Sequence, residues 1–178
     1  LGYSIKRDEQ VAQIVLPRIR NTAMLAVVAA LMAFPSAIVA GLLIGRYPHS
    51  RIGRAINTLG VLAMTLPEFV IATILWLVFS IWIPIFPGVT VVPSNATVLE
   101  LLPHIWMPAL TLAAVVFAHS MRTMKAGVTT IQTMPFVESA RLRGTKERVT
   151  LLRHILPAAL PPVVNTIAVD AAWLLTGT

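Results

Sequence analysis

The sequence contains no cysteine and few charged residues. Without cysteine there are no disulfides, and cysteine-based metal or redox sites are excluded. Only 12% of the 178 residues are charged, whereas soluble domains carry about 25%, and 57% are hydrophobic. The composition therefore predicts a membrane protein that is surrounded by lipid.

Acidic residues are also scarce, with seven Asp and Glu against 14 Lys and Arg, which gives a net charge of +7. Such an excess is found in nucleic-acid-binding proteins. Here, however, the basic residues cluster in segments between apolar runs, as the positive-inside rule of membrane proteins predicts. No nucleic-acid partner is expected.

Motifs that carry chemistry are missing as well. The sequence has no GxxxxGK[ST] phosphate loop, no HExxH, no GxSxG and no pair of histidines at metal-ligand spacing. His49 and His154 lie in polar segments, where a solvated or interface histidine is the ordinary case, and His119 lies near the polar end of an apolar run. We expect no catalytic residues, no cofactor, no metal and no enzymatic activity in this chain.

Four apolar runs are long enough to cross a hydrocarbon core of about 30 Å. They cover residues 22–45, 56–83, 103–121 and 157–178. Pro35 lies in the middle of the first run and predicts a kink there, and Pro67 is expected to break the second run in its middle. The expected fold is an all-α, polytopic transmembrane bundle, with residues 1–178 forming one domain. Because the chain starts at Leu1 and stops in an apolar run, we expect a fragment truncated at both ends.

The segment before the first run is mixed in character. Val11, Ile14 and Val15 have helical spacing and precede Pro17. This pattern favours a short amphipathic helix at the membrane interface, ahead of the first span; a simple linker is the alternative.

The distribution of Lys and Arg predicts the orientation. Segments 46–55 and 122–157 carry three and seven of the 14 basic residues, whereas the 84–102 segment carries none. We therefore expect segments 46–55 and 122–157 to be cytoplasmic.

The 134–157 segment is the longest stretch that water would tolerate. Pro135 is expected to begin a short helix and Gly144 to end it in the left-handed conformation. Thr145 is expected to cap a second helix, with Glu147 in its first turn, and Pro157 to end that helix. Two short helices joined by a glycine suggest a mechanical contact with a partner.

Three polar residues fall inside the apolar runs, where an unpaired charge is costly. They are Glu68, Asn165 and Asp170. They are candidates for a translocation pathway, although each could instead form a hydrogen bond between helices.

Residues Glu138 to Pro157 resemble the signature loop of permease subunits of binding-protein-dependent ABC importers. The family pattern is Glu-Ala-Ala, three residues, Gly, nine residues, then Ile-x-Leu-Pro. This chain has Glu138-Ser139-Ala140, then Gly144 and His154-Ile155-Leu156-Pro157 at the same spacing. The Ser and His departures are common in the dipeptide/oligopeptide/nickel branch. Further features of that branch are Arg141 to Gly144 with Arg153-His154, Arg122 with Met124-Lys125, Pro67-Glu68-Phe69 and the Pro17 to Thr22 lead-in.

The resemblance implies a type I ABC importer permease fold, of which the chain would hold about four of six spans. It also implies a second permease subunit, two ATP-binding subunits that hydrolyse ATP, and an extracytoplasmic substrate-binding protein. Peptides or similar small solutes would be transported. The ATPase-coupling residues carried over or predicted from the loop are Phe136, Glu138, Ser139, Ala140, Arg141, Gly144, Leu156 and Pro157.

Within this loop, Phe136, Val137 and Ala140 are expected to offer an apolar contact to the ATPase, with Glu138, Arg141 and Arg143 as a charged rim. Two alternatives remain: a secondary transporter or channel that uses Glu68 and Asp170, and a membrane scaffold without transport activity.

Overall fold

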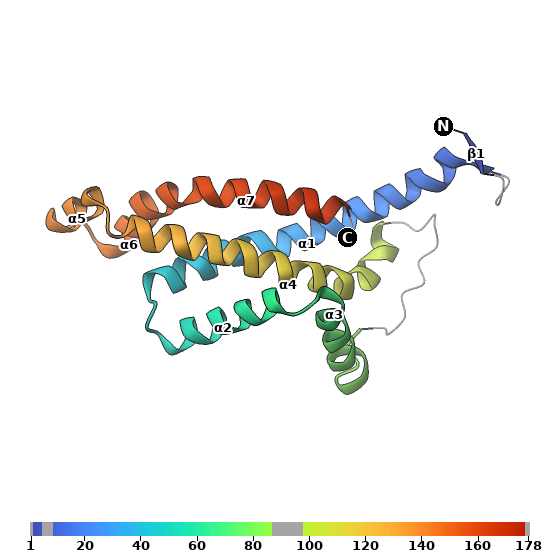
Figure 1. The fold of residues 1–178 in the computed structure, drawn as a ribbon, viewed down its shortest axis with the longest axis horizontal. Helices are drawn as coiled ribbons and strands as arrows, with labels where there is room; N and C mark the ends of the chain where they lie inside the picture. Colours follow the sequence, from blue (N-terminus) through green and yellow to red (C-terminus); the bar gives the residue numbers. More distant parts are fainter. Residues whose placement is uncertain (1, 5–8, 87–97, 177–178) are drawn as a thin grey trace.

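The computed structural model describes residues 2–4, 9–86 and 98–176 (Figure 1). Apart from a two-residue antiparallel ladder that pairs β1 (Tyr3–Ser4) with β2 (Glu9–Gln10), the regular structure in these ranges is helical. In chain order the helical segments are α1 (Val11–Arg46), α2 (Arg51–Thr65), α3 (Glu68–Trp76), η1 (Leu77–Trp82), α4 (Val98–Ile131), α5 (Pro135–Leu142), α6 (Glu147–Thr150), η2 (Leu151–Ile155) and α7 (Leu156–Thr176). The predicted all-α class is confirmed.

Helices α1, α4 and α7 run side by side along the length of the molecule, and α2 lies along α4 (Figure 1). The short helices α5 and α6 lie together at one end, where α1 and α4 finish. The described residues contain three helices long and apolar enough to cross a membrane, over 11–46, 105–131 and 147–175. A fourth candidate is the bent pair 51–65 and 68–82.

The α1–α4 contact is close because α1 presents small residues at every fourth position. Ala29, Ala33 and Ala37 are buried, and Gly41 and Gly45 continue the same row. A Cβ atom on Gly41 would lie 2.6 Å from the Met121 carbonyl oxygen, and one on Gly45 would lie 2.7 Å from Val128 Cβ. Such rows of small residues let membrane helices pack backbone against backbone.

The separate amphipathic helix predicted before the first span is absent from this structure. Helix α1 begins at Val11 and continues without a break through Pro17 and Pro35 to Arg46. Each proline removes one backbone hydrogen bond, whereas every other added residue forms one, so an established helix can continue. Near Pro35, the Ser36 hydroxyl donates a hydrogen bond to the Ala33 carbonyl at 3.0 Å, so this backbone oxygen has a side-chain partner.

The predicted break of the second run at Pro67 is confirmed, and it is a sharp one. Helices α2 and α3 are bent by 116°. Leu66 is extended (φ −82°, ψ 136°), as expected for a residue before proline, and Pro67 becomes the N-cap of α3. Helix α3 consequently turns away from the long axis of the bundle (Figure 1).

Candidate functional site

Helix α5 and the turn that follows it form the first candidate site, at the end of the bundle. Pro135 occupies the first turn, as predicted. Gly144 has φ +75°, its N–H donates to the Arg141 carbonyl at 2.9 Å, and the Thr145 N–H donates to the Ala140 carbonyl at 3.2 Å. This pair of bonds is the Schellman arrangement, in which a left-handed residue ends the helix. The predicted left-handed conformation of Gly144 at the end of this helix is confirmed.

The second helix starts and ends differently from the prediction. Its N-cap is Lys146 rather than Thr145, whose N–H takes part in the Schellman turn. Glu147 does lie in the first turn. At the other end, helical structure continues through Pro157 into α7, by way of the π-helical segment η2.

The π turn explains why Pro157 does not end the helix. The Leu156 N–H donates to the Leu151 carbonyl, five residues earlier, instead of the usual four. A π turn is wider than an α turn and relieves the contact between a proline ring and the preceding carbonyls. Residues 147–175 therefore form one continuous candidate span.

The apolar contact expected on α5 is divided between two faces. Val137 and Ala140 are fully buried, and Val137 packs with Leu42, Met124 and Ile155 inside the chain. They cannot contact a partner in this structure, which corrects that expectation. Phe136 is 45% exposed and Leu142 is 83% exposed, so these side chains form the apolar part of the outer face. Sequence spacing alone did not single out Leu142.

The remaining coupling candidates fall at the surface or at its edge. Glu138 and Ser139 are exposed, and the Ser139 hydroxyl donates to the Pro135 carbonyl at 2.8 Å. Leu156 is half-buried and Pro157 is exposed.

Ion pairs attach this segment to the end of α1. Glu147 Oε1 lies 2.9 Å from Arg46 Nη2 and 3.2 Å from Arg141 Nε. The Gln132 side chain adds a third connection by donating to the Gly45 carbonyl at 2.8 Å. The end of α1, the end of α4 and the α5–α6 segment are thereby held to one another.

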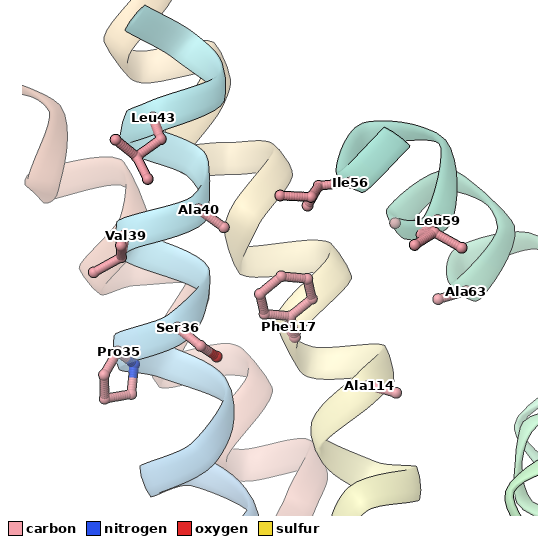
Figure 2. Close-up of a pocket in the computed structure, with 11 residues that line it drawn as sticks. Pro35, Ser36, Val39, Ala40, Leu43, Ile56, Leu59, Ala63, Ala114 and Phe117 are labelled. Atoms are coloured by element: carbon pink, nitrogen blue, oxygen red, sulfur yellow. The ribbon is translucent and has the colours of Figure 1, made fainter. Parts of the chain in front are cut away.

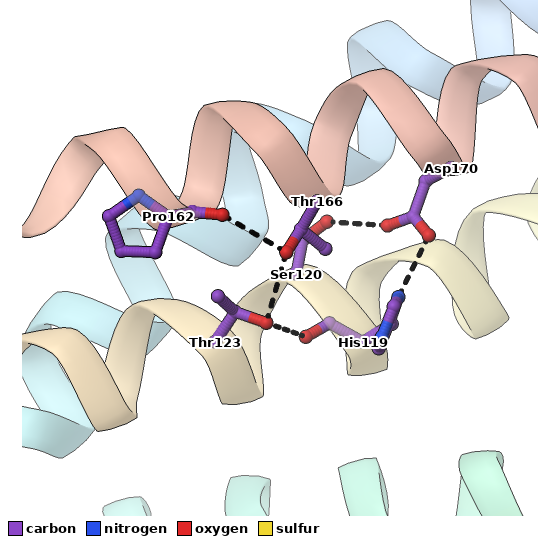
Figure 3. Close-up of polar contacts among 6 residues, drawn as sticks. All are labelled: His119, Ser120, Thr123, Pro162, Thr166 and Asp170. Atoms are coloured by element: carbon purple, nitrogen blue, oxygen red, sulfur yellow. Dashed lines mark hydrogen bonds and ion pairs between the residues drawn. The ribbon is translucent and has the colours of Figure 1, made fainter.

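The second candidate site is the polar contact between α4 and α7 (Figure 3). Asp170 is 7% exposed. One of its carboxylate oxygens lies 2.8 Å from His119 Nδ1, and the other accepts a hydrogen bond from the Ser120 hydroxyl at 3.0 Å. One turn further along, the Thr166 hydroxyl donates to the Thr123 hydroxyl at 3.4 Å.

The three pathway candidates are not brought together by contacts among the described residues. Glu68 is half-buried at the first turn of α3, and Asn165 is exposed on α7. Among the described residues, Asp170 is the one of the three with partners in a polar cluster. Sequence reasoning considered His119 without assigning it a role and did not consider Ser120, although two adjacent polar residues inside an apolar run were a usable signal.

Cavities adjoin these helices, and a larger and a smaller one bear on the candidate sites. The larger, of about 810 Å³, lies between α1, α2 and α4 and has an almost wholly apolar lining (Figure 2). The smaller, of about 330 Å³, is lined by Met64, Val115, Val116, His119, Val169, Asp170 and Trp173. Within the described ranges, no three His, Asp or Glu residues are grouped as a metal site.

A multi-span helical protein with two short helices, α5 and α6, at one end belongs to the class of polytopic membrane proteins. Comparison with known proteins defines the class further. Residues 37–178 match the model of the binding-protein-dependent transport system inner membrane component family. The chain belongs to this family. The family consists of transport permeases, and the chain is an integral, multi-pass component of the inner membrane.

Similar proteins include three permeases. The chain is 26% identical over 163 residues to the oligopeptide transport system permease protein AppB of Bacillus subtilis, covering 90% of this chain and 52% of AppB. It is 26% identical over 171 residues to the peptide transport system permease protein SapB of Salmonella typhimurium, covering 83% and 52%. It is 25% identical over 153 residues to the dipeptide transport system permease protein DppB of B. subtilis, covering 86% and 47%.

The chain spans about half the length of these relatives. Their names agree with the resemblance to the peptide branch of importer permeases, which is confirmed.

Proposed function

We propose that this chain forms part of the translocation pathway of an ATP-driven importer for peptides or similar small solutes, and that a separate ATPase moves it through the 134–157 segment. The complete importer would pair two permease subunits with two ATP-binding subunits and an extracytoplasmic binding protein. The names of the relatives support the substrate class.

The observation that carries the proposal is the burial pattern of the α5–α6 knob, the two short helices over residues 135–150 at the end of the bundle. Val137 and Ala140 fasten α5 to the bundle, while Phe136, Leu142 and exposed Glu138 face outward. A helix anchored on one side and apolar on the other suits a groove in a partner. The ion pairs of Glu147 would carry a displacement of the knob to the end of α1.

The orientation belongs to the same proposal. Segments 46–55 and 122–157 are placed in the cytoplasm, where ATP is available. This placement rests on the positive-inside distribution of Lys and Arg.

A disulfide crosslink tests the docking directly, since the chain has no cysteine of its own. Leu142→Cys, at a side chain that is 83% exposed, should crosslink to cysteines placed in a groove of the ATPase. Leu59→Cys on α2, which is 65% exposed, is the matched control and should not crosslink. Absence of a crosslink from Leu142→Cys in an assembled, active transporter would contradict docking.

The rival mechanism is tested by the energy source. In proteoliposomes that contain the complete assembly, uptake should require internal ATP and survive collapse of the ion gradients. Uptake that needs a gradient but no ATP would favour a secondary transporter that uses Glu68 and Asp170.

A further inference from the structure

The cavity of about 330 Å³ between α2, α4 and α7 combines an apolar lining with one oriented polar cluster. Its apolar groups come from Met64, Val115, Val116, Val169 and Trp173, and its polar side chains are His119 and Asp170. Ligand sites commonly have this character, with many apolar side chains and a few fixed polar ones.

Asp170 fixes the proton arrangement of His119. An ionised carboxylate only accepts hydrogen bonds, so the 2.8 Å contact requires the proton on His119 Nδ1. In the neutral imidazole, Nε2 then becomes the acceptor. The His119 side chain is 48% exposed, whereas the Asp170 side chain is 10% exposed. The accessible member of the pair is therefore the histidine, with the carboxylate behind it.

The second carboxylate oxygen is held by Ser120, which is fully buried. Two residues of α4, His119 and Ser120, thus contact the two oxygens of one carboxylate on α7 (Figure 3). With a neutral imidazole the cluster has a formal charge of −1, and the described residues that line the cavity include no Lys or Arg. A negative, hydrogen-bond-accepting cluster in an apolar cavity is suited to a donor that carries positive charge.

Two further residues narrow the choice of ligand. Trp173 contributes an aromatic ring to the lining, and the face of a tryptophan ring attracts cations. At the edge of the cavity, Arg122 Nη1 lies 3.9 Å from Met64 Sδ. A carboxylate on the same solute would be attracted to Arg122, which favours a zwitterion over a simple cation.

The position along the helix suits a solute in transit. Asp170 lies 14 residues after the start of α7, about 21 Å at 1.5 Å per residue, and within residues 147–175, which are long and apolar enough to cross a membrane. Charged groups within such a span normally face a bundle interior or a watery cavity.

We propose that this cavity binds the ammonium group of a zwitterionic solute, such as the N-terminus of a peptide, with His119 Nε2 as acceptor and Asp170 as counter-charge. The assignment of the solute to a transport pathway rests on the proposed function. The binding itself does not, and it is tested separately.

The binding experiment uses the purified protein in lipid nanodiscs with ¹⁵N-labelled histidine. Dialanine is titrated while the imidazole resonances are followed by NMR, and His119→Gln identifies the resonance of His119. Dialanine should shift the His119 Nε2 resonance, and N-acetyl-dialanine at the same concentration should not. Equal shifts from both peptides, or no shift from either, would overturn the proposal.

The transport experiment uses the assembled transporter in proteoliposomes. In the wild type, N-acetylation should reduce dialanine uptake by roughly tenfold, the factor set by one charged hydrogen bond. His119→Gln and Asp170→Asn should each reduce this preference severalfold. Thr129→Val, on the exposed side of α4, is the control and should keep it. Any selection by a separate binding protein is the same in all four proteins.

The outcomes separate the two proposals. A preference for the free amine that is unchanged in both variants would overturn the ammonium site while leaving the importer intact. Absence of ATP-dependent uptake in the wild type would refute the proposed function, and the NMR titration would still decide whether the cavity binds the ammonium group.

Discussion

Glu147 Oε1 lies 2.9 Å from Nη2 of Arg46, so the first turn after the α5 knob is joined to the last turn of α1. Arg46 also lies over the Tyr47 ring, with 5.1 Å from its Cζ atom to the ring centroid. The Arg46 side chain is 23% exposed and that of Glu147 is 48% exposed. The pair is therefore partly solvated and adds little to the stability of the fold. Its main effect is to fix the position of α6 relative to the end of α1.

Breaking this ion pair should uncouple the importer more than it destabilises the fold. We expect Glu147→Gln to lower stability by only about 0.2–1 kcal/mol, the range for exposed pairs. Solute transported per ATP hydrolysed should fall, because the knob is no longer attached to α1. The double reversal Arg46→Glu with Glu147→Arg should restore only part of the loss, because the new arginine would also face Arg141. Arg148→Gln, at the next residue, is the control; an equal loss there would contradict a specific role for the pair.

Substitution of Gly144 should act through backbone conformation alone. A Cβ atom at this position would meet nothing within 4 Å, whereas φ is +75°. Gly144→Val should cost roughly 1–2 kcal/mol for the left-handed conformation and lower the yield of the Leu142→Cys crosslink. Gly144→Asn should retain most of the yield because asparagine tolerates this region. Equal loss in both variants would point to a side-chain clash with the partner instead.

Gly41 should be far less tolerant of a methyl group than Gly60. The added Cβ at Gly41 would lie 2.6 Å from a backbone oxygen of Met121, which cannot move without separating α1 from α4. At Gly60 the nearest atom is the flexible Met121 Cε, at 2.5 Å. Gly41→Ala should therefore lower the free energy of unfolding by about 1–3 kcal/mol, measured by thermal or denaturant unfolding in detergent. Gly60→Ala should be close to neutral, and the reverse order would contradict the packing argument.

The 116° corner at Pro67 allows either a broken span or a re-entrant loop, and accessibility distinguishes them. If α2 and α3 cross the membrane together, a cysteine at His49 should react with an impermeant thiol reagent only from the cytoplasmic side. A cysteine at Ile85, a side chain that is 63% exposed, should react only from the outside. Labelling of both positions from the same side would establish a re-entrant loop.

The sequence predicted the features that depend on local chemistry. Apolar runs specified the helices, and Gly144 specified the turn, because few other residues accept positive φ. Proline was the least reliable signal. Pro17, Pro35 and Pro157 lie within continuous helical structure, whereas Pro67 makes a sharp corner. Whether a proline interrupts a helix depends on packing around it, which spacing along the chain does not report.

In the candidate sites, too, local sequence predicted some features, whereas others depend on packing between distant segments. The knob was found from its spacing, but the face that α5 presents depends on how Val137 packs against Met124 and Ile155. In the polar cluster, Asp170 was predicted as a candidate, but its contacts with His119 and Ser120 were not. Its partners lie 50 and 51 residues away in the sequence, and their proximity follows from the register of α4 against α7. No local pattern encodes that register.

The continuity of helical structure from Glu147 through η2 to Thr176 has a mechanical consequence. Asp170 lies 23 residues after Glu147, about 35 Å along the same rod. A rotation of the first turn of α6 about the helix axis would also rotate Asp170, unless the π-helical segment η2 deforms and absorbs it. Since α4 holds His119 and Ser120 on a different rod, even a modest rotation of α7 would shear both hydrogen bonds of the carboxylate at once.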